Sequence, residues 1–510
     1  MGGIDAGGSD MDFAQAKRAN PAGFLTVRRK TIPLTRMSPK LPLIQTTLGV
    51  CAFAASAVSI SAASQPKNIV LMLVDDLGWG DTGPYGGRFA ETPNFDRLAK
   101  EGMRFTNAYA PAPICSATRA AIMTGKAPAR LNFEFVIQAR GAKPPPGTVL
   151  RQPDFPRFLD PAETSMGDVM GAAGYVTGYF GKWHLSEHGV PGNERYLGYG
   201  SQGPDKQGFV HVNEERGSHP YSYPKGKKNR PGYGDFKEGE FAPDLLTDRM
   251  IDFLKAHRDE KFFLCLSHYY VHAPIHTRCE WLIKKYKAKA ARMGLQMDKE
   301  HIEYAAFVET MDHLVGRVLD EMDSLGLAQN TLFVLMSDNG GDPRFADNGG
   351  LRGGKWTLYE GGTRVPLMAR WPGIIGAGSV NDTPVIGTDL MATFCEALGV
   401  KKPASAVDSM SFLPLLTGKA KALPRDTLTW HFPFYHPRVT GTKPISSIRK
   451  GDLKLIYFYE DDRLELFDLK NDPLEKNDLS SLKTQIAANM KKTLLDTLNA
   501  QGARFPTKRE

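Results

Sequence analysis

Between residues 67 and 400, two patterns of apolar positions alternate along the chain. Short runs of β-branched, aliphatic and aromatic residues predict buried strands, the clearest being 68–74, 175–180, 262–267 and 331–337. Between the last two, apolar residues recur from Tyr304 to Met322 at spacings of four and three, which predicts a helix long enough to cross a sheet face. The alternation predicts an α/β domain with a large, mostly parallel central sheet flanked by helices.

The pattern changes near residue 425. Predicted strands at 451–459 and 464–469 precede a terminal helix over 483–499. We therefore expect three parts in the chain. They are a leader and signal peptide over 1–64, a catalytic domain over 67–424 and a smaller C-terminal α+β subdomain over 425–510.

The N-terminal part has the layout of an export signal. Residues 41–66 carry no charge and follow a basic stretch that runs from Arg28 to Lys40, and small residues at 61–63 offer a cleavage site. We expect an export machinery to deliver the protein to the periplasm or the cell exterior. A membrane anchor is the alternative, although Thr46 and Thr47 dilute the apolar run.

The charge balance argues against a nucleic-acid partner. The chain has 64 Lys and Arg residues and 56 Asp and Glu residues. Residues 1–64 contain seven of the basic and three of the acidic residues. The rest of the chain therefore has 57 basic and 53 acidic residues, a net charge of +4. No basic run with interleaved aromatic residues forms a track for phosphates. We expect no nucleic acid to bind.

Polar residues follow each of the four predicted strands. In strand order they are Asp75, Asp76, Lys182, His184, His268, His272, Asp338 and Asn339. Because ligands of open α/β sheets gather beyond the carboxyl ends of the strands, we expect these side chains to lie near one another. A turn or cap role is the alternative for any one of them.

Four of these residues offer only oxygen ligands, the donors that a hard divalent cation such as calcium prefers: Asp75, Asp76, Asp338 and Asn339. Zinc would favour histidine or cysteine. The alternative is a carboxylate cluster neutralised by nearby Lys or Arg.

The segment PICSATRAAIMTGK adds a reactive group. A helix is expected over 116–123, which puts Cys115 at its N-terminus and Arg119 one turn further on. Helix N–H groups and a guanidinium there favour an anion. Such a site also lowers the pKa of a thiol, so a cysteine thiolate nucleophile is one possible use of Cys115.

In this order, these segments resemble the type I, formylglycine-dependent sulfatases of the alkaline phosphatase superfamily, which are arylsulfatase-like enzymes. CSATR fits that family's Cys-x-Pro/Ala-x-Arg signature, with Ala117 where proline is commoner. The similarity runs from Asn68 to the C-terminus, through NIVLMLVDDLGWGD, GYFGKWHL, YVHAPIHT, LMSDNGG, LRGGKWTLYEGGTRVP and ELFDLKNDPLEKNDLS.

The resemblance implies a sulfuric ester hydrolase whose Cys115 is converted to formylglycine by a formylglycine-generating or equivalent maturation enzyme. It implies calcium ligands at Asp75, Asp76, Cys115, Asp338 and Asn339. Around the sulfate it implies Arg119, Lys182, His184, His272 and Lys355.

The resemblance also implies roles in a reaction. One hydroxyl of the formylglycine hydrate, with Asp338 as proton acceptor, would attack sulfur, and His272 with Lys355 would protonate the leaving oxygen. His184 would deprotonate the second hydroxyl, so that the hydrate collapses and expels sulfate. Arg119, Lys182 and calcium would spread the developing charge.

Two other functions are open to such a chain. A phosphate or phosphonate monoester hydrolase of the same superfamily often uses Ser or Thr with two histidine-bound zinc ions, a ligand set that this sequence lacks. A non-catalytic binder of sulfated glycans is the other, and the presence of Cys115 and Arg119 argues against it.

We expect the substrate to be a sulfated small molecule or glycan. The stretches 141–157 and 196–240 predict surface loops, and the second is long enough to be functional. A run of aromatic residues near the start of the C-terminal part can approach the site mouth or pack within the protein: Trp430, His431, Phe434, Tyr435 and His436.

Overall fold

The structure is a computed structural model that describes residues 66–137, 144–186, 202–224, 231–234, 236–436 and 442–509. These residues belong to the unit Ser61–Glu510, and the expected signal peptide and its anchor alternative lie outside them. Within the described ranges, no helix combines the length and apolar character needed to cross a bilayer.

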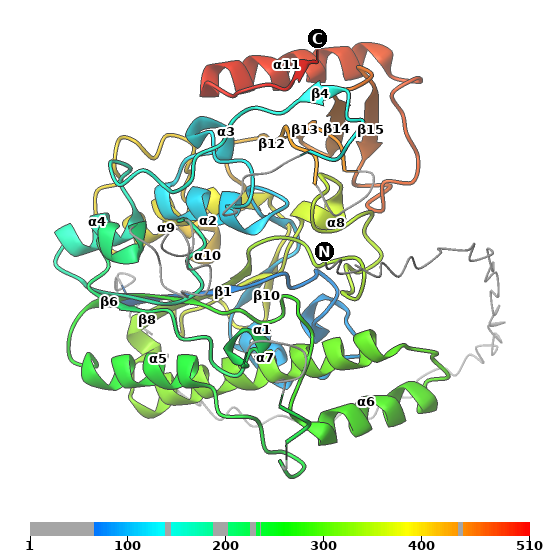
Figure 1. Cartoon of the computed structure of the whole chain (residues 1–510). Coiled ribbons are helices and arrows are strands. Elements are labelled where there is room, and N and C mark those ends of the chain that lie inside the picture. Colours follow the sequence, from blue (N-terminus) through cyan, green and yellow to red (C-terminus); the bar gives the residue numbers. More distant parts are fainter. Residues whose placement is uncertain are drawn as a thin grey trace, which may run out of the picture. The chain divides into compact units, whose positions relative to one another are not determined.

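The described residues contain a central sheet in the strand order β10-β2-β9-β8-β1-β7-β5-β6 (Figure 1). Its strands are β1 (Asn68–Val74), β2 (Met103–Phe105), β5 (Val176–Gly181), β6 (His211–Asn213), β7 (Phe262–Ser267), β8 (Thr331–Ser337), β9 (Leu367–Arg370) and β10 (Ser379–Asn381). Strand β1 pairs in parallel with β7 and β8, whereas β9 runs antiparallel to β8 and β2. The predicted mostly parallel sheet is confirmed, and β1, β7 and β8 have the predicted bounds.

Both faces of the sheet are buried, which explains why its central strands are continuous apolar runs. Alternate residues of β1 enter opposite cores, with Leu71 on one face and Met72 on the other. Helices α1 (Pro93–Glu101), α5 (Leu245–Ala256) and α7 (Lys299–Ser324) cover one face, and α2 (Cys115–Thr124), α4 (Met166–Ala172) and α9 (Leu390–Ala397) cover the other (Figure 1). Helix α6 (Glu280–Arg292) packs on α7. Three short helices are α3 (Pro128–Leu131), α8 (Glu360–Thr363) and α10 (Leu413–Leu416).

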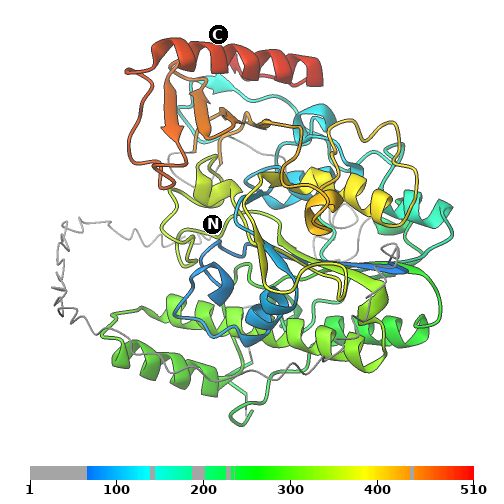
Figure 2. The same ribbon diagram turned by 180° about the vertical axis from the view of Figure 1, so that it is seen from behind.

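A second, antiparallel sheet lies near the C-terminus and contains β12 (Thr427–Phe432), β13 (Ile445–Lys450), β14 (Leu453–Phe458) and β15 (Leu464–Asp468). Helix α11 (Thr484–Gln501) covers one face through Ala487, Met490, Leu494 and Leu498, as the view from behind also shows (Figure 2). The expected α+β subdomain is therefore present, while its boundary at 424/425 stays a prediction.

Regular structure inside the two predicted loops corrects one expectation. Strand β6 and the 3-10 turn Pro220–Ser222 lie within 196–240, and β4 (Leu150–Arg151) pairs with β16 (Thr507–Lys508). These strands are short and polar, so pairing with a distant partner, and not an apolar run, defines them.

Candidate active site

The carboxyl ends of β1 and β8 bring four of the predicted ligands together. Asp75 and Asp76 follow β1, Asp338 and Asn339 follow β8, and all four are buried. The backbone N–H of Asp76 donates to Asp338 Oδ1 at 3.2 Å, and the Asn339 amide donates to Asp76 Oδ1 at 2.7 Å. Asp76 has a φ of 64°, a left-handed conformation that acidic residues adopt more readily than most.

Two buried lysines reach this cluster from other segments. Lys182 Nζ lies 2.5 Å from Asp75 Oδ2, and Lys355 Nζ lies 2.7 Å from Asp76 Oδ2. Burial disfavours the charged ammonium of Lys355, but Asp76, Cys115 and Asp75 together outweigh it and hold the pKa of Lys355 well above its usual range. Burial likewise opposes ionisation of Asp76, yet Lys355, His272 and Lys182 together keep the pKa of Asp76 below its usual value.

Gly181 shapes the turn that delivers Lys182. It ends β5 with a φ of 97°, and a Cβ there would collide with the carbonyl oxygen of Ser267. That oxygen accepts the backbone N–H of Lys182 at 2.8 Å. A side chain at this position would therefore disturb the contact that sets Lys182 against Asp75.

Arg119 lies in α2, one turn after Cys115, and its guanidinium binds Asp338. Nε and Nη2 lie 2.9 and 2.7 Å from Asp338 Oδ2, and Nη1 donates to the carbonyl of Lys182 and to the hydroxyl of Ser267. Burial raises the pKa of Asp338 despite this neighbour. The carboxylates are thus paired with Lys and Arg side chains, as expected for the alternative in which the cluster holds no metal. A contact between Arg119 and a sulfate stays a prediction.

Cys115 is the first residue of α2 and faces the carboxylates. Its Sγ lies 3.5 Å from Asp75 Oδ1 and 3.9 Å from Asp76 Oδ1. Burial raises the pKa of the thiol, and the lowering by Lys182 and Lys355 is too weak to reverse it. The expectation that the helix N-terminus lowers this pKa is therefore wrong, because desolvation of the thiolate prevails. A thiolate nucleophile is the less favoured use of Cys115.

His272 approaches the cluster from the segment after β7, and His184 follows β5 in sequence. His272 Nε2 lies 3.6 Å from Asp76 Oδ2, and burial, helped by Lys355, lowers the pKa of His272 to about 3. His184 is partly exposed, has a φ of 56° and lies two residues beyond Lys182. Its part in a reaction stays a prediction.

The buried oxygen donors Asp75, Asp76, Asp338 and Asn339 fit a hard divalent cation. Ligand atoms of Asp75 and Asp76 lie within 4.8 Å of each other and of ligand atoms of Cys115 and His272. The Oδ1 atom of Asn339 is buried and accepts no hydrogen bond from any described residue. A buried carbonyl oxygen without a donor is costly, and a cation beside the carboxylates would satisfy it.

Comparison with known proteins agrees with this geometry. A sulfatase family model matches residues 67–400, and a model of the C-terminal region of N-sulphoglucosamine sulphohydrolase matches residues 354–501. A sulfatase of Formosa agariphila is 32% identical over 488 residues, which cover 83% of this chain and 86% of that protein. The chain belongs to the sulfatase family.

Two further relatives support the same assignment for this sulfatase. Human N-acetylgalactosamine-6-sulfatase is 34% identical over 382 residues, which cover 70% of this chain and 67% of that protein. The crystal structure of Ps i-CgsB in complex with k-i-k-neocarrahexaose is 25% identical and superimposes with a TM-score of 0.67, covering 85% of this chain and 93% of that one. The protein is a sulfuric ester hydrolase of the alkaline phosphatase superfamily.

Some residues of this sulfatase's site were not predicted from the sequence. Ser267 ends β7, accepts from Arg119 and donates its hydroxyl to the carbonyl of Lys182 at 2.7 Å. Its place at the end of a strand was the available signal. Tyr221 contacts His272 from a segment 51 residues away, for which the local sequence held no signal.

The aromatic run of the C-terminal part mostly packs inside this sulfatase. Trp430 is buried and donates its indole N–H to the carbonyl of Ala110 at 2.8 Å. His436 lies with its ring centre 3.8 Å from that of Trp356, the residue after Lys355. Within this aromatic run, His436 thus contacts Trp356, which follows the site residue Lys355 in sequence.

Proposed function

We propose that this sulfatase hydrolyses sulfate esters of carbohydrates through a formylglycine formed from Cys115, with calcium as its cofactor. The observation that carries the proposal is the position of Cys115 at a helix start, buried against Asp75 and Asp76 and with a thiol pKa that burial raises. A thiol in this state is a weak nucleophile, whereas a modified side chain at the same position does not depend on thiolate formation.

Asp75, Asp76, Asp338, Asn339 and modified Cys115 would hold the cation. When present, a formylglycine hydrate supplies two hydroxyls and calcium supplies positive charge beside the sulfate oxygens. Asp338 would accept a proton, and burial suits it to that role because its pKa is raised. His272, with Nε2 turned toward the cluster, would protonate the leaving oxygen together with Lys355. Burial favours the neutral ring in the free site, and the negative charge of a bound sulfate ester would favour the imidazolium that carries the proton.

Arg119 and Lys182 would balance negative charge as sulfur is attacked, and His184 would accept the proton that ends the cycle. Arg119 is held at three sides by Asp338, Lys182 and Ser267, so it costs little reorganisation during the reaction.

A carbohydrate substrate is favoured by a cavity whose lining includes Tyr221, a residue that contacts His272. The cavity has a volume of about 540 Å³ and is lined by Asn213, Glu214, Glu215, Arg216, Tyr221, Ser222, Tyr223 and Pro224. One guanidinium, two carboxyls, an amide and two tyrosines are groups that bind sugar hydroxyls and ring faces. Relatives named for N-acetylgalactosamine-6-sulfate, or bound to a neocarrahexaose, support the same substrate class.

The proposal includes partners before catalysis. Cys115 is 1% exposed, so a maturation enzyme would reach CSATR before the domain folds. The uncharged stretch 41–66 supports export to the periplasm or exterior. N-terminal sequencing of the cell-derived protein, with a first residue near 64, tests the export proposal, and an intact leader contradicts it.

The central experiment uses full-length protein from a host that contains a formylglycine-generating enzyme. Peptide mass spectrometry should show the aldehyde at Cys115, and the protein should release sulfate from 4-nitrophenyl sulfate and from members of a sulfated carbohydrate panel. Preference for the phosphate ester of the same phenol would favour a phosphate or phosphonate monoester hydrolase. An unmodified thiol with glycan binding and no turnover would favour a binder, and metal analysis with zinc but no calcium would overturn the cation.

A further inference from the structure

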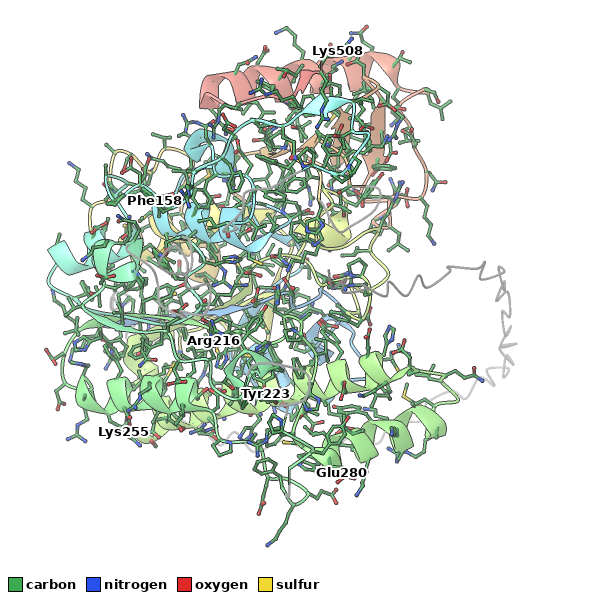
Figure 3. All side chains as sticks on the ribbon, in the orientation of Figure 1. Phe158, Arg216, Tyr223, Lys255, Glu280 and Lys508 are labelled. Atoms are coloured by element: carbon green, nitrogen blue, oxygen red, sulfur yellow. The ribbon has the colours of Figure 1, made fainter. Side chains whose placement is uncertain are left out.

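A segment between β6 and α5 is fastened to the residues that follow β7. It runs between Arg216 and Tyr223, both labelled in Figure 3. The backbone N–H of Ser218 donates to Asp244 Oδ2 at 2.7 Å, and the hydroxyls of Ser218 and Tyr270 lie 3.0 Å apart. These contacts set the next residues, 219–221, against His272.

His219 in this segment holds the backbone of His272. It is fully buried, with Nε2 2.7 Å from the carbonyl oxygen of His272 and Nδ1 3.1 Å from the backbone nitrogen of Tyr221. A carbonyl only accepts, so Nε2 of His219 carries the hydrogen, while Nδ1 accepts the N–H of Tyr221. The neutral His219 ring therefore holds the segment to His272 through Nε2 and fixes the turn to Tyr221 through Nδ1.

Tyr221 holds the ring of His272. Its hydroxyl donates to the carbonyl of Ala273 at 2.9 Å and lies 3.0 Å from His272 Nδ1. Because the hydroxyl gives its one proton to Ala273, its oxygen accepts from Nδ1, which also faces the same carbonyl. Nδ1 of His272 therefore carries a hydrogen, and its Nε2 faces Asp76 with a lone pair when the ring is neutral.

Arg216 supports the ring and the backbone of Tyr221. Its guanidinium lies 5.4 Å from the centre of the Tyr221 ring, and Nη1 donates to the Tyr221 carbonyl at 3.0 Å. These contacts help to hold Tyr221 where its hydroxyl reaches His272.

We propose that Tyr221 is a positioning residue, which acts through His272 by fixing its ring orientation and its Nδ1 hydrogen. This inference rests on the proposed role of His272 as the group that protonates the leaving oxygen. In that step His272 acts as the imidazolium, which carries hydrogens on both ring nitrogens and which the negative charge of a bound sulfate ester favours. The oxygen–sulfur bond breaks, its electron pair stays on the leaving oxygen, and that oxygen takes the proton from Nε2. The neutral ring that remains has its hydrogen on Nδ1, the tautomer that Tyr221 and Ala273 stabilise.

The test compares the matured full-length protein with its Tyr221→Phe variant on aryl sulfates whose phenols differ in acidity. Phenyl sulfate needs protonation of its leaving oxygen far more than 4-nitrophenyl sulfate does. We expect kcat to fall about tenfold or more on phenyl sulfate but only about twofold on 4-nitrophenyl sulfate, with KM little changed. Equal losses on both substrates, or none, would overturn the positioning role.

Tyr270→Phe is the matched control. It removes a buried hydroxyl that binds Ser218 in the same segment, and that hydroxyl does not contact the His272 ring. Its losses, if any, should be equal for the two substrates, and a leaving-group dependence like that of Tyr221→Phe would count against the proposal. Wild-type protein that carries formylglycine but hydrolyses no aryl or carbohydrate sulfate would instead refute the proposed function. The two failures are therefore distinguishable.

A measurement on wild-type protein removes any dependence on how the variants fold. Nitrogen-15 spectra of histidine-labelled protein should show His272 in the Nδ1–H tautomer and His219 in the Nε2–H tautomer. An Nε2–H tautomer for neutral His272 would overturn the inference, and His219 serves as the internal reference.

Discussion

Among the described residues, buried charges gather both in the candidate active site, the catalytic cluster, and at the junction with the C-terminal sheet, the junction cluster. In the junction cluster, the fully buried Lys454 of β14 lies 2.8 Å from Glu360 Oε1 and 3.0 Å from Glu475 Oε1. The backbone N–H of Glu360, at the start of α8, also donates to Glu475 Oε2 at 2.7 Å. Figure 1 shows α8 close to β14 and β15, and this cluster links the α8 segment to the C-terminal sheet.

The two clusters resemble each other in burial and in pairing of opposite charges, but they differ in what they leave available. The catalytic cluster holds a thiol against its carboxylates and includes the buried Asn339 Oδ1, which no described residue satisfies. The junction cluster contains no such reactive group, and its lysine is shared between two carboxylates. Burial and pairing alone therefore do not mark function, whereas a reactive group beside an unsatisfied ligand atom does.

The largest expected effect separates the clusters by activity. Cys115→Ala should lower sulfatase activity by at least about 10⁴-fold, because it removes the side chain that we propose as the precursor of the nucleophile, while the melting temperature stays within a few degrees. Rates of sulfate release and thermal melts measure the two effects. Cys265→Ala, a core thiol of β7, is the control and should keep its activity, so comparable losses in both variants would contradict the assignment.

The next effect concerns stability at the junction. Lys454→Met should lower the free energy of unfolding by about 3–5 kcal/mol, because it removes the buried lysine that two buried carboxylates share. Denaturant melts measure this loss, and the activity per folded molecule should persist. A loss of activity without a loss of stability would show that the junction, too, serves the reaction.

Calcium removal should affect the catalytic cluster alone. A chelator should abolish most activity and remove about 2.7 kcal/mol of stability relative to a calcium concentration one hundred times Kd. Added calcium should restore both, in wild-type protein and equally in Lys454→Met. Restoration by zinc instead of calcium would contradict the oxygen-rich ligand set.

The smallest effect is the pH dependence of the junction. Burial, with a contribution from Glu360, raises the pKa of Glu475 to about 7 against Lys454. The folded pKa lies above the unfolded value, so the contribution of Glu475 to stability is full below about pH 4.5 and is lost as the pH rises toward 7. In the wild type, the free energy of unfolding should fall by about 1 kcal/mol per pH unit between about pH 4.5 and 7. Denaturant melts across this pH range should show a smaller fall for Glu475→Gln. An unchanged slope would show that Glu475 is ionised throughout.

Much of the catalytic cluster could be predicted because its signals are local. Continuous apolar runs define β1, β7 and β8, and the predicted oxygen ligands follow β1 and β8 directly in sequence: Asp75, Asp76, Asp338 and Asn339. The junction cluster could not be predicted, since Glu360 and Lys454 are 94 residues apart and a lysine in an alternating strand resembles a solvent-facing one. Likewise, the sequence suggested a lowered thiol pKa at Cys115, but the depth of burial depends on what packs above it.

The amino-acid sequence by itself determined the family, the main strands and helices, and the residues that can supply chemistry at the strand ends, because hydrophobic period and residue type act over a few positions. Tertiary structure alone decided which charges are buried against which partners, that Arg119 binds Asp338, and that Tyr221 reaches His272. Pairing energies and desolvation depend on distance in space, and local sequence does not encode the neighbours that folding brings together.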